Sequence, residues 1–175
     1  MRILIVLFLF VWTECRGEEV DKRECMKLLH PKSLRCCKTD PMKSFFKHDE
    51  DLKECFHGRK GPPPKYAHGP PTPPPCDMEI CVAKKKGYLN EDGSINKEAL
   101  RSIIEKDLAG NPTLVSGITK KCIEGDLDDY APADFCDLHK LRHCILLQSY
   151  DTCPDWDEEN VNCADIKDLV EKCQA

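Results

Sequence analysis

The sequence predicts an all-α protein whose helices are cross-linked by disulfides. Three observations indicate this fold class. Signals that start and stop helices recur at short intervals along the 175 residues. No stretch convincingly shows the alternation of apolar and polar residues that is typical of a half-buried strand. Thirteen cysteines are available to join the helices covalently.

Residues 1–17 have the layout of a secretory signal peptide. A short positive start is followed by an unbroken apolar run of ten residues from Ile3 to Trp12, and Cys15 and Gly17 offer sites for cleavage. A membrane span needs about 20 apolar residues, so this run is too short to cross a bilayer. We expect a secreted, extracellular protein with a single domain over residues 18–175. A retained amphipathic anchor is the alternative.

Cleavage also makes the number of cysteines even. Cys15 lies in the leader, so twelve cysteines remain in a mature chain of 158 residues. Paired cysteines persist in the oxidising compartments through which secreted proteins pass, so we expect up to six disulfides. The mature chain carries a net charge of −6, without a basic stripe. This charge argues against nucleic acid or an anionic membrane surface as a partner.

Helix signals divide the first half of the chain into three helices. The first is predicted from Val20 to His30, where Pro31 ends it. The second covers residues 40–58, with Asp40 as N-cap, proline after it, and a glycine at the C-terminal end. The third runs from Cys76 to Lys86, with acids in its first turns and lysines in its last, as the helix dipole favours.

Four more helices are predicted in the second half. Asn96 caps one helix, and Asn111-Pro112 opens the next. The longest helix is predicted from Pro132 to Ser149, and Asn162 is expected to cap the last. The total is about seven helices joined by short connections, which is typical of a compact all-α domain.

Two polar or irregular segments interrupt these helices. Gly61 to Pro75 holds eight of the thirteen prolines, so it is neither a helix nor a central strand. We expect a stiff loop there; an alternative is that its proline runs dock in an aromatic groove. The acidic residues from Asp155 to Glu159 are expected to form a solvated loop.

The spacing of the cysteines is the most informative motif. Cys76 and Cys81 lie on one predicted helix, from which they can reach two different neighbours. Forty residues separate Cys81 from Cys122, and Cys144-x8-Cys153 is followed directly by proline. We interpret this order as a third helix that is clamped to elements near both ends of the chain. Each such bond contributes about 2–4 kcal/mol, chiefly by restricting the unfolded state.

This arrangement resembles the insect odorant-binding proteins. The shared features are the leader, the close cysteine pair on a helix, the gap of about forty residues and the later Cys-x8-Cys. Cys153-Pro154 and the extra cysteines resemble the Plus-C branch of that family, and the turn from Asn90 to Gly93 is similar to the one before its fourth helix. The resemblance covers Cys36 to Cys173. It implies a compact bundle of six or seven helices around an apolar cavity.

The resemblance also implies interlocked disulfides. It implies the pairs Cys76–Cys144 and Cys122–Cys153, and a bond from Cys81 to a cysteine upstream. That upstream partner is either Cys37 or Cys55. Cys36 and Cys37 are adjacent, and the strain of so small a ring argues against a bond between them. The resemblance assigns no partner to Cys25, Cys36, Cys136, Cys163 or Cys173.

The function that the resemblance implies is reversible carriage of small hydrophobic molecules such as odorants or pheromones. A membrane chemoreceptor or a second copy of the chain would be a further partner. Each apolar side chain below is either part of the cavity wall or ordinary core, because sequence does not separate the two. The candidates for the cavity wall are Leu100, Ile104, Leu108, Leu114, Ile118, Leu138, Leu141 and Ile145.

The sequence carries no recognisable catalytic motif, and we expect no enzyme, cofactor or metal. His139 and His143 are four residues apart on one predicted helix, a spacing that chelates metals in some proteins. We expect them instead on an exposed polar face, and a role in pH-dependent release is the alternative. Two other functions compete with the carrier: a secreted effector without a deep pocket, and a protease inhibitor that uses the loop from Gly61 to Pro75.

Overall fold

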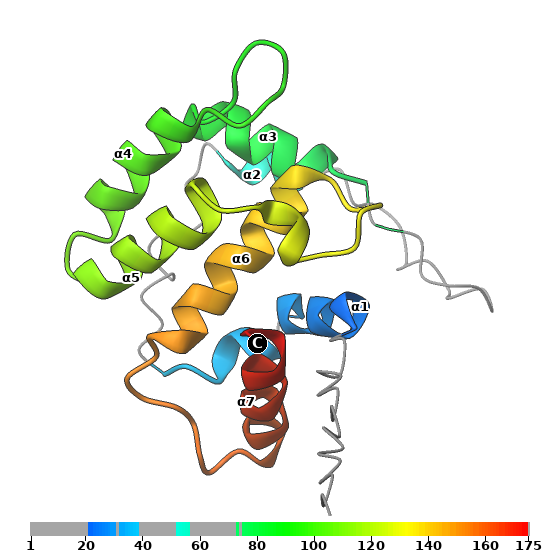
Figure 1. Cartoon of the computed structure of the whole chain (residues 1–175), viewed down its shortest axis with the longest axis vertical. Coiled ribbons are helices and arrows are strands. Elements are labelled where there is room, and N and C mark those ends of the chain that lie inside the picture. The colour runs from blue at the N-terminus through cyan, green and yellow to red at the C-terminus, as the bar shows by residue number, and fades with distance from the viewer. Residues whose placement is uncertain (1–20, 31, 39–51, 57–72, 74, 175) are drawn as a thin grey trace, which may run out of the picture.

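A computed structural model describes residues 21–30, 32–38, 52–56, 73 and 75–174. These residues form seven α-helices, several short 3-10 turns and one π-helical turn (Figure 1). The described residues contain no strand, only two isolated bridges, Cys37 to Trp156 and Leu89 to Ile95. The all-α prediction is therefore confirmed. The helices are α1 Lys22–Cys25, α2 Lys53–Phe56, α3 Asp77–Lys86, α4 Lys97–Asp107, α5 Pro112–Ile118, α6 Asp137–Asp151 and α7 Val161–Gln174.

The caps predicted for the central helices are confirmed. The Asn96 side chain accepts a hydrogen bond from the backbone N–H of Ala99 at 2.9 Å and starts α4. The Asn111 side chain does the same for Leu114 at 3.1 Å and starts α5. Both side chains satisfy N–H groups that have no partner within the helix. At the end of α3, Gly87 has a φ of 80°, a left-handed conformation that glycine adopts without a steric cost.

Three helix boundaries differ from the prediction. The first helix is α-helical only over Lys22–Cys25 and then tightens into a 3-10 turn over Met26–Leu29. The longest helix begins at Asp137 and not at Pro132, because Cys136 has the extended backbone of an N-cap residue. The last helix begins at Val161, and the cap is Asn160, whose side chain accepts from the backbone N–H of Asn162.

Helix α6 runs through the middle of the fold (Figure 1). Helices α3, α4 and α5 lie on one side of it, and α1 and α7 lie on the other. Twelve of its fifteen residues are buried, including polar ones. Because neighbours surround this helix, its sequence lacks the single apolar stripe of a surface helix.

The two sides of α6 hold two apolar clusters. The larger cluster lies among α3, α4, α5 and the first half of α6. The smaller one joins Leu28 and Val170 to Leu147 and Tyr150 in the second half of α6. Helix α6 therefore contributes to both halves of the core.

The twelve cysteines from Cys25 to Cys173 are all paired, and their pairing follows this division. Three bonds are concentric and tie the start of the described chain to its end: Cys25–Cys173, Cys36–Cys163 and Cys37–Cys153. The other three overlap along the chain, and two of them lie within or against the larger cluster: Cys55–Cys81, Cys76–Cys136 and Cys122–Cys144.

This pairing corrects two of the expected bonds. Cys76 bonds to Cys136 and not to Cys144, and Cys122 bonds to Cys144 and not to Cys153. Cys81 bonds to Cys55, one of the two expected partners. The third helix is thus clamped to α2 and to the start of α6, while the two ends of the chain are tied to each other. The Cys-x8-Cys-Pro spacing was misleading, because Cys153 belongs to the concentric set.

The acidic loop from Asp155 to Glu159 is held by the segment around Cys36. The Lys38 backbone N–H donates to the Asp155 carbonyl, and the Asp157 N–H donates to the Cys36 carbonyl. Asp157 also lies 3.4 Å from the Lys38 ammonium. The loop is therefore fixed by backbone pairing next to two disulfides, although most of its side chains remain exposed.

Several expectations concern residues outside the described part of the chain. They are the leader over residues 1–17, most of the helix expected at 40–58 and most of the proline-rich loop at 61–75. Among the described helices, none has both the length and the apolar character that crossing a bilayer demands.

Candidate functional site

The structure brings all eight apolar candidates into one cluster. Three lie along α4 and its C-cap, two lie on α5, and three lie on the first half of α6. Their exposed fractions range from 0 to 8%. Such burial is expected of a core residue and of the wall of a closed cavity alike. The cluster of candidates consists of Leu100, Ile104, Leu108, Leu114, Ile118, Leu138, Leu141 and Ile145.

Five further residues of this cluster were absent from the prediction. Cys122 and Cys144 form the disulfide that crosses it. Ala83, Tyr88 and Ile123 are its other three buried members. Tyr88 follows the left-handed Gly87 directly, and such an apolar residue after a C-terminal glycine often packs back on its helix. That local signal was available in the sequence.

Tyr88 places a phenol at the edge of the apolar cluster. Burial, together with the smaller effect of the nearby charge of Glu79, raises the pKa of Tyr88 to about 12, although Arg142 opposes both effects. The phenol is therefore neutral at physiological pH. A neutral hydroxyl beside apolar side chains is the kind of polar group that orients a ligand in an otherwise hydrophobic pocket.

Two open hollows lie on the surface near α5. One has a volume of about 750 Å³ and the other of about 520 Å³. None of the eight candidates lines either of them. Both are open to solvent and include charged residues in their lining, so neither is the enclosed apolar cavity that the resemblance implies. The larger is lined by Glu105, Ala109, Pro112, Val115, Ser116, Thr119, Lys120 and Glu124.

His139 and His143 are buried, which corrects the expectation of an exposed polar face. Their exposed fractions are 3% and 1%. Both lie on α6, whose turns are enclosed by α3 on one side and by the first helical segment on the other. The sequence pattern of α6 does not reveal this, because a helix enclosed on several sides can bury a polar side chain that finds a partner.

The partner of His139 is a buried carboxylate on α3. The Nε2 atom of His139 lies 3.1 Å from Oε1 of Glu79, and Arg142 Nη1 lies 3.2 Å from the same oxygen. Glu79 is 8% exposed. Burial alone would raise the pKa of Glu79, but the hydrogen bond and the charge of His139 outweigh it, so the net pKa is lowered. An ionised Glu79 thus joins α3 to α6 inside the fold.

The other ring nitrogen of His139 faces a disulfide. Nδ1 lies 3.4 Å from Cys136 Sγ and 3.8 Å from Cys76 Sγ. The three ligand atoms lie within 4.8 Å of one another, and no other group of three such metal-ligating side chains occurs among the described residues. Thiolates bind metals, whereas here the two sulfurs are bonded to each other.

His143 has a different environment. Its Nδ1 contacts the backbone carbonyl of Tyr130. Burial lowers the pKa of His143, and this contact with Tyr130 opposes the shift only in part. The neutral ring is therefore favoured in the folded protein, at a point where α6 passes from one apolar cluster to the other.

Comparison with protein-family models, with curated proteins and with solved structures finds no match to this chain. The described residues by themselves show an all-helical, disulfide-rich small domain.

Proposed function

We propose that this protein is a secreted carrier that reversibly binds small hydrophobic molecules within its larger apolar cluster. The observation that carries the proposal is the convergence of eight apolar side chains from three helices, with the Cys122–Cys144 bond inside their cluster and Cys76–Cys136 packed against it. Cross-linked helices can hold a volume open that an ordinary core would close by relaxing. Tyr88 supplies a neutral polar group at the edge of this volume.

The order of the overlapping bonds supports kinship with odorant-binding proteins. Six cysteines from Cys55 to Cys144 take part, and they pair first with third, second with fifth and fourth with sixth. The bonds implied by the resemblance have this same interlocked order. They differ only in register, because Cys136 and Cys144 take the places expected for Cys144 and Cys153. The three concentric bonds supply the extra cysteines that resemble the Plus-C branch.

Elementary energetics gives an affinity suited to a carrier. A ten-carbon ligand gains roughly 0.8 kcal/mol for each buried methylene, or about 8 kcal/mol in all. The gross gain alone corresponds to a Kd of about 1 μM, and the several kcal/mol that association costs in lost motion make binding of a ligand of this size weaker than that. A ligand held this weakly can be taken up and released without a large change in the protein.

Displacement of a fluorescent apolar probe tests the proposal. The mature chain is titrated with the probe, and volatile and lipid compounds of increasing chain length then compete for it. A carrier gives saturable binding at micromolar to tens of micromolar concentrations of a probe that buries more apolar surface than the ten-carbon ligand. Absence of saturable binding at tens of micromolar would overturn the carrier and favour the effector.

A pair of leucine variants separates a cavity wall from packed core. Leu114 lies in the larger cluster and Leu147 in the smaller, and both are at most 1% exposed. Leu114→Phe is expected to fill the ligand volume, which weakens probe binding about tenfold while the free energy of unfolding changes by less than about 1 kcal/mol. Leu147→Phe should cost about 1–3 kcal/mol by overpacking and leave probe binding intact. Equal destabilisation by both substitutions contradicts a cavity at Leu114.

One observation favours the effector as the second candidate. The complete burial of the eight candidates is also what a closed core shows, and a closed core leaves only the surface to act. If the chain does not bind the probe but binds another protein of the same secreted fluid, the effector function is supported. The protease-inhibitor alternative relies on the proline-rich loop, most of which lies outside the described residues.

A further inference from the structure

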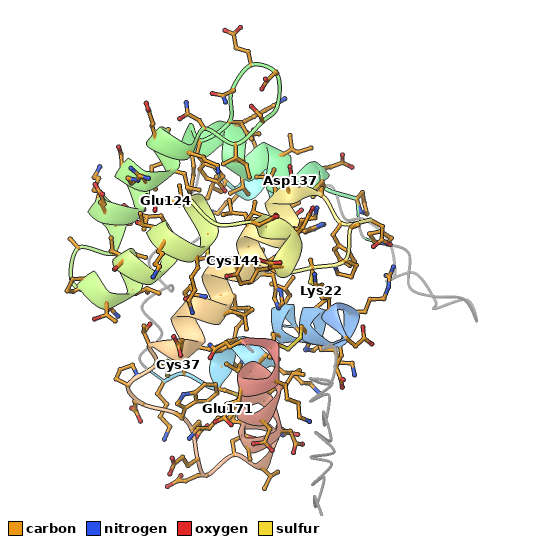
Figure 2. The ribbon with its side chains drawn as sticks, viewed as in Figure 1. Lys22, Cys37, Glu124, Asp137, Cys144 and Glu171 are labelled. Atoms are coloured by element: carbon orange, nitrogen blue, oxygen red, sulfur yellow. A yellow bond between two sulfur atoms is a disulfide. The ribbon has the colours of Figure 1, made fainter. Side chains whose placement is uncertain are left out.

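One of the six disulfides has surroundings that the carrier function does not require. Cys76 is the N-cap residue of α3, and Cys136 is the N-cap residue of α6. The bond therefore joins the N-terminal ends of two helices, of ten and fifteen residues. Figure 2 shows Asp137, the residue after Cys136, beside the ribbon of α3. A thiolate released at either position would lie in the positive field of a helix N-terminus, which stabilises it.

A buried histidine reinforces this effect. His139 directs Nδ1 at both sulfurs, at 3.4 Å from Cys136 and 3.8 Å from Cys76. In the described part of the chain, no other disulfide has a histidine nitrogen or carboxylate oxygen within 4.8 Å of both its sulfurs. A proton on Nδ1 would pair with a sulfur anion there. Cationic neighbours and helix N-termini are the two settings that make cysteines reactive.

The remaining neighbours fix the direction of His139. The Glu79 carboxylate on α3 contacts Nε2 of His139. Nδ1 is therefore the ring nitrogen that faces the sulfurs. Arg142 from α6 holds the same carboxylate oxygen of Glu79. The Phe135 ring packs edge-on against the imidazole, with centroids 6.0 Å apart. Both cysteines remain partly exposed, so a small molecule can approach the bond.

We propose that Cys76–Cys136 is a thiol-exchange site, at which a low-molecular-weight thiol bonds to Cys76 and Cys136 is released as the thiolate. The thiolate of the small molecule attacks Cys76 Sγ and forms a new S–S bond. The bond between Cys76 and Cys136 breaks, and its electron pair goes to Cys136 Sγ. Cys136 is the leaving group because it is nearer to Nδ1, and a more stable thiolate leaves faster.

The reaction is balanced and reversible. The released Cys136 thiolate can attack Cys76 again and expel the small thiol. Alternatively, a second small thiolate attacks the outer sulfur of the mixed disulfide, which yields a free Cys76 and the disulfide of the small molecule. While the bond is open, no covalent link joins the start of α3 to the start of α6. His139 touches the reacting sulfur, whereas Glu79 is a positioning residue that acts through His139.

Limited reaction with glutathione tests the site. The oxidised mature chain is exposed to reduced glutathione, free thiols are trapped with N-ethylmaleimide at successive times, and peptides are mapped by mass spectrometry. We expect glutathione on Cys76 and the alkyl group on Cys136 before any other bond opens. Cys55–Cys81 is the matched control, because it also ends on α3, is also partly exposed and has no histidine nitrogen near both sulfurs within the described part of the chain. Opening of Cys55–Cys81 as early as Cys76–Cys136 would overturn the proposal.

Two variants isolate the histidine. His139→Gln keeps an N–H for Glu79 but loses the nitrogen at the sulfurs, so opening of Cys76–Cys136 should slow about five- to tenfold while Cys55–Cys81 is unaffected. Glu79→Gln should slow it less, because the ring stays in place. An unchanged rate in His139→Gln contradicts the proposal. If that variant fails to fold, the order of opening in the unmodified chain decides alone.

A pH profile distinguishes this role from a structural one. The rate at Cys76–Cys136, divided by the concentration of glutathione thiolate, should be higher at low pH than at high pH, because a protonated nitrogen that faces the sulfurs assists departure of the thiolate. The charged groups that face His139 are Glu79, and Arg142 behind it. The rise should be absent in His139→Gln. A flat profile in the unmodified chain would overturn the assignment of His139.

Discussion

Glu79 Oε1 and His139 Nε2 lie 3.1 Å apart between α3 and α6, and both side chains are almost completely buried. Removal of one partner from such a pair leaves the other without compensation inside the fold. Glu79→Ala is therefore expected to lower the free energy of unfolding by about 2–3 kcal/mol, measured by urea denaturation. Glu24→Ala is the control, because the exposed Glu24–Lys27 pair should contribute less than about 1 kcal/mol. Equal effects of the two substitutions would contradict the importance of the buried pair.

The same carboxylate predicts a loss of stability in acid. The pKa of Glu79 in the folded protein lies below its ordinary value of 4.5. The unfolded chain therefore binds the proton first as pH falls. The contribution of Glu79 is complete above pH 4.5 and is lost as pH drops from there through the folded pKa. Glu79→Gln should flatten the profile of unfolding free energy in this window and leave its slope above pH 6 unchanged.

His143 predicts a separate loss at higher pH. Burial lowers its pKa below the ordinary 6.5. Between the unfolded and the folded pKa, the unfolded chain therefore binds a proton that the folded chain does not bind. Stability is complete above pH 6.5 and falls as pH decreases towards the folded pKa, by at most about 1.4 kcal/mol per pH unit for one proton. His143→Asn, which keeps a donor near the Tyr130 carbonyl, should remove this slope. Persistence of the slope in the variant would assign it to another group.

The nesting of the concentric disulfides predicts how much stability the outermost bond, Cys25–Cys173, contributes. Cys25 and Cys173 are 148 residues apart, and an isolated bond of that span would stabilise by about 5 kcal/mol in the chain-entropy picture. Cys36–Cys163 already closes most of that loop. The bond therefore restricts only about twenty further residues, and Cys25→Ser with Cys173→Ser should cost about 3 kcal/mol. A loss near the larger value would show that the nested bonds act independently in the unfolded chain.

Local features of the fold were readable from the sequence, whereas the pairing of distant residues was not. Asn96 and Asn111 cap helices through bonds to residues three positions away, so a short window contains the whole signal. The partner of Cys76 depends instead on how α3 and α6 pack, and two cysteines eight positions apart on or beside α6 offered equivalent choices. Spacing alone could not decide between Cys136 and Cys144.

The candidate site shows the same division. The eight apolar side chains were identified because they recur at helical spacing, and the cluster gathers them all. The expectation that His139 is exposed was wrong, because the sequence of α6 does not reveal that neighbouring elements enclose this helix on several sides. Its partner Glu79 lies sixty positions earlier on a helix whose other acids and lysines are mostly solvated, and nothing local distinguishes it.

The start of α7 offers a direct test of a boundary that the sequence misassigned. Asn162 was expected to cap this helix, but the side chain of Asn160 accepts from the backbone N–H of Asn162 at 3.1 Å. Asn160→Ala leaves that N–H without its partner and is expected to lower the free energy of unfolding by about 1 kcal/mol. Asn160→Asp should retain the cap. Asn162→Ala removes only an exposed side-chain contact and should stay within about 0.5 kcal/mol of the unmodified chain. Thermal unfolding of the three variants decides between the two positions, since a cap at Asn162 would reverse the order of the two alanine effects.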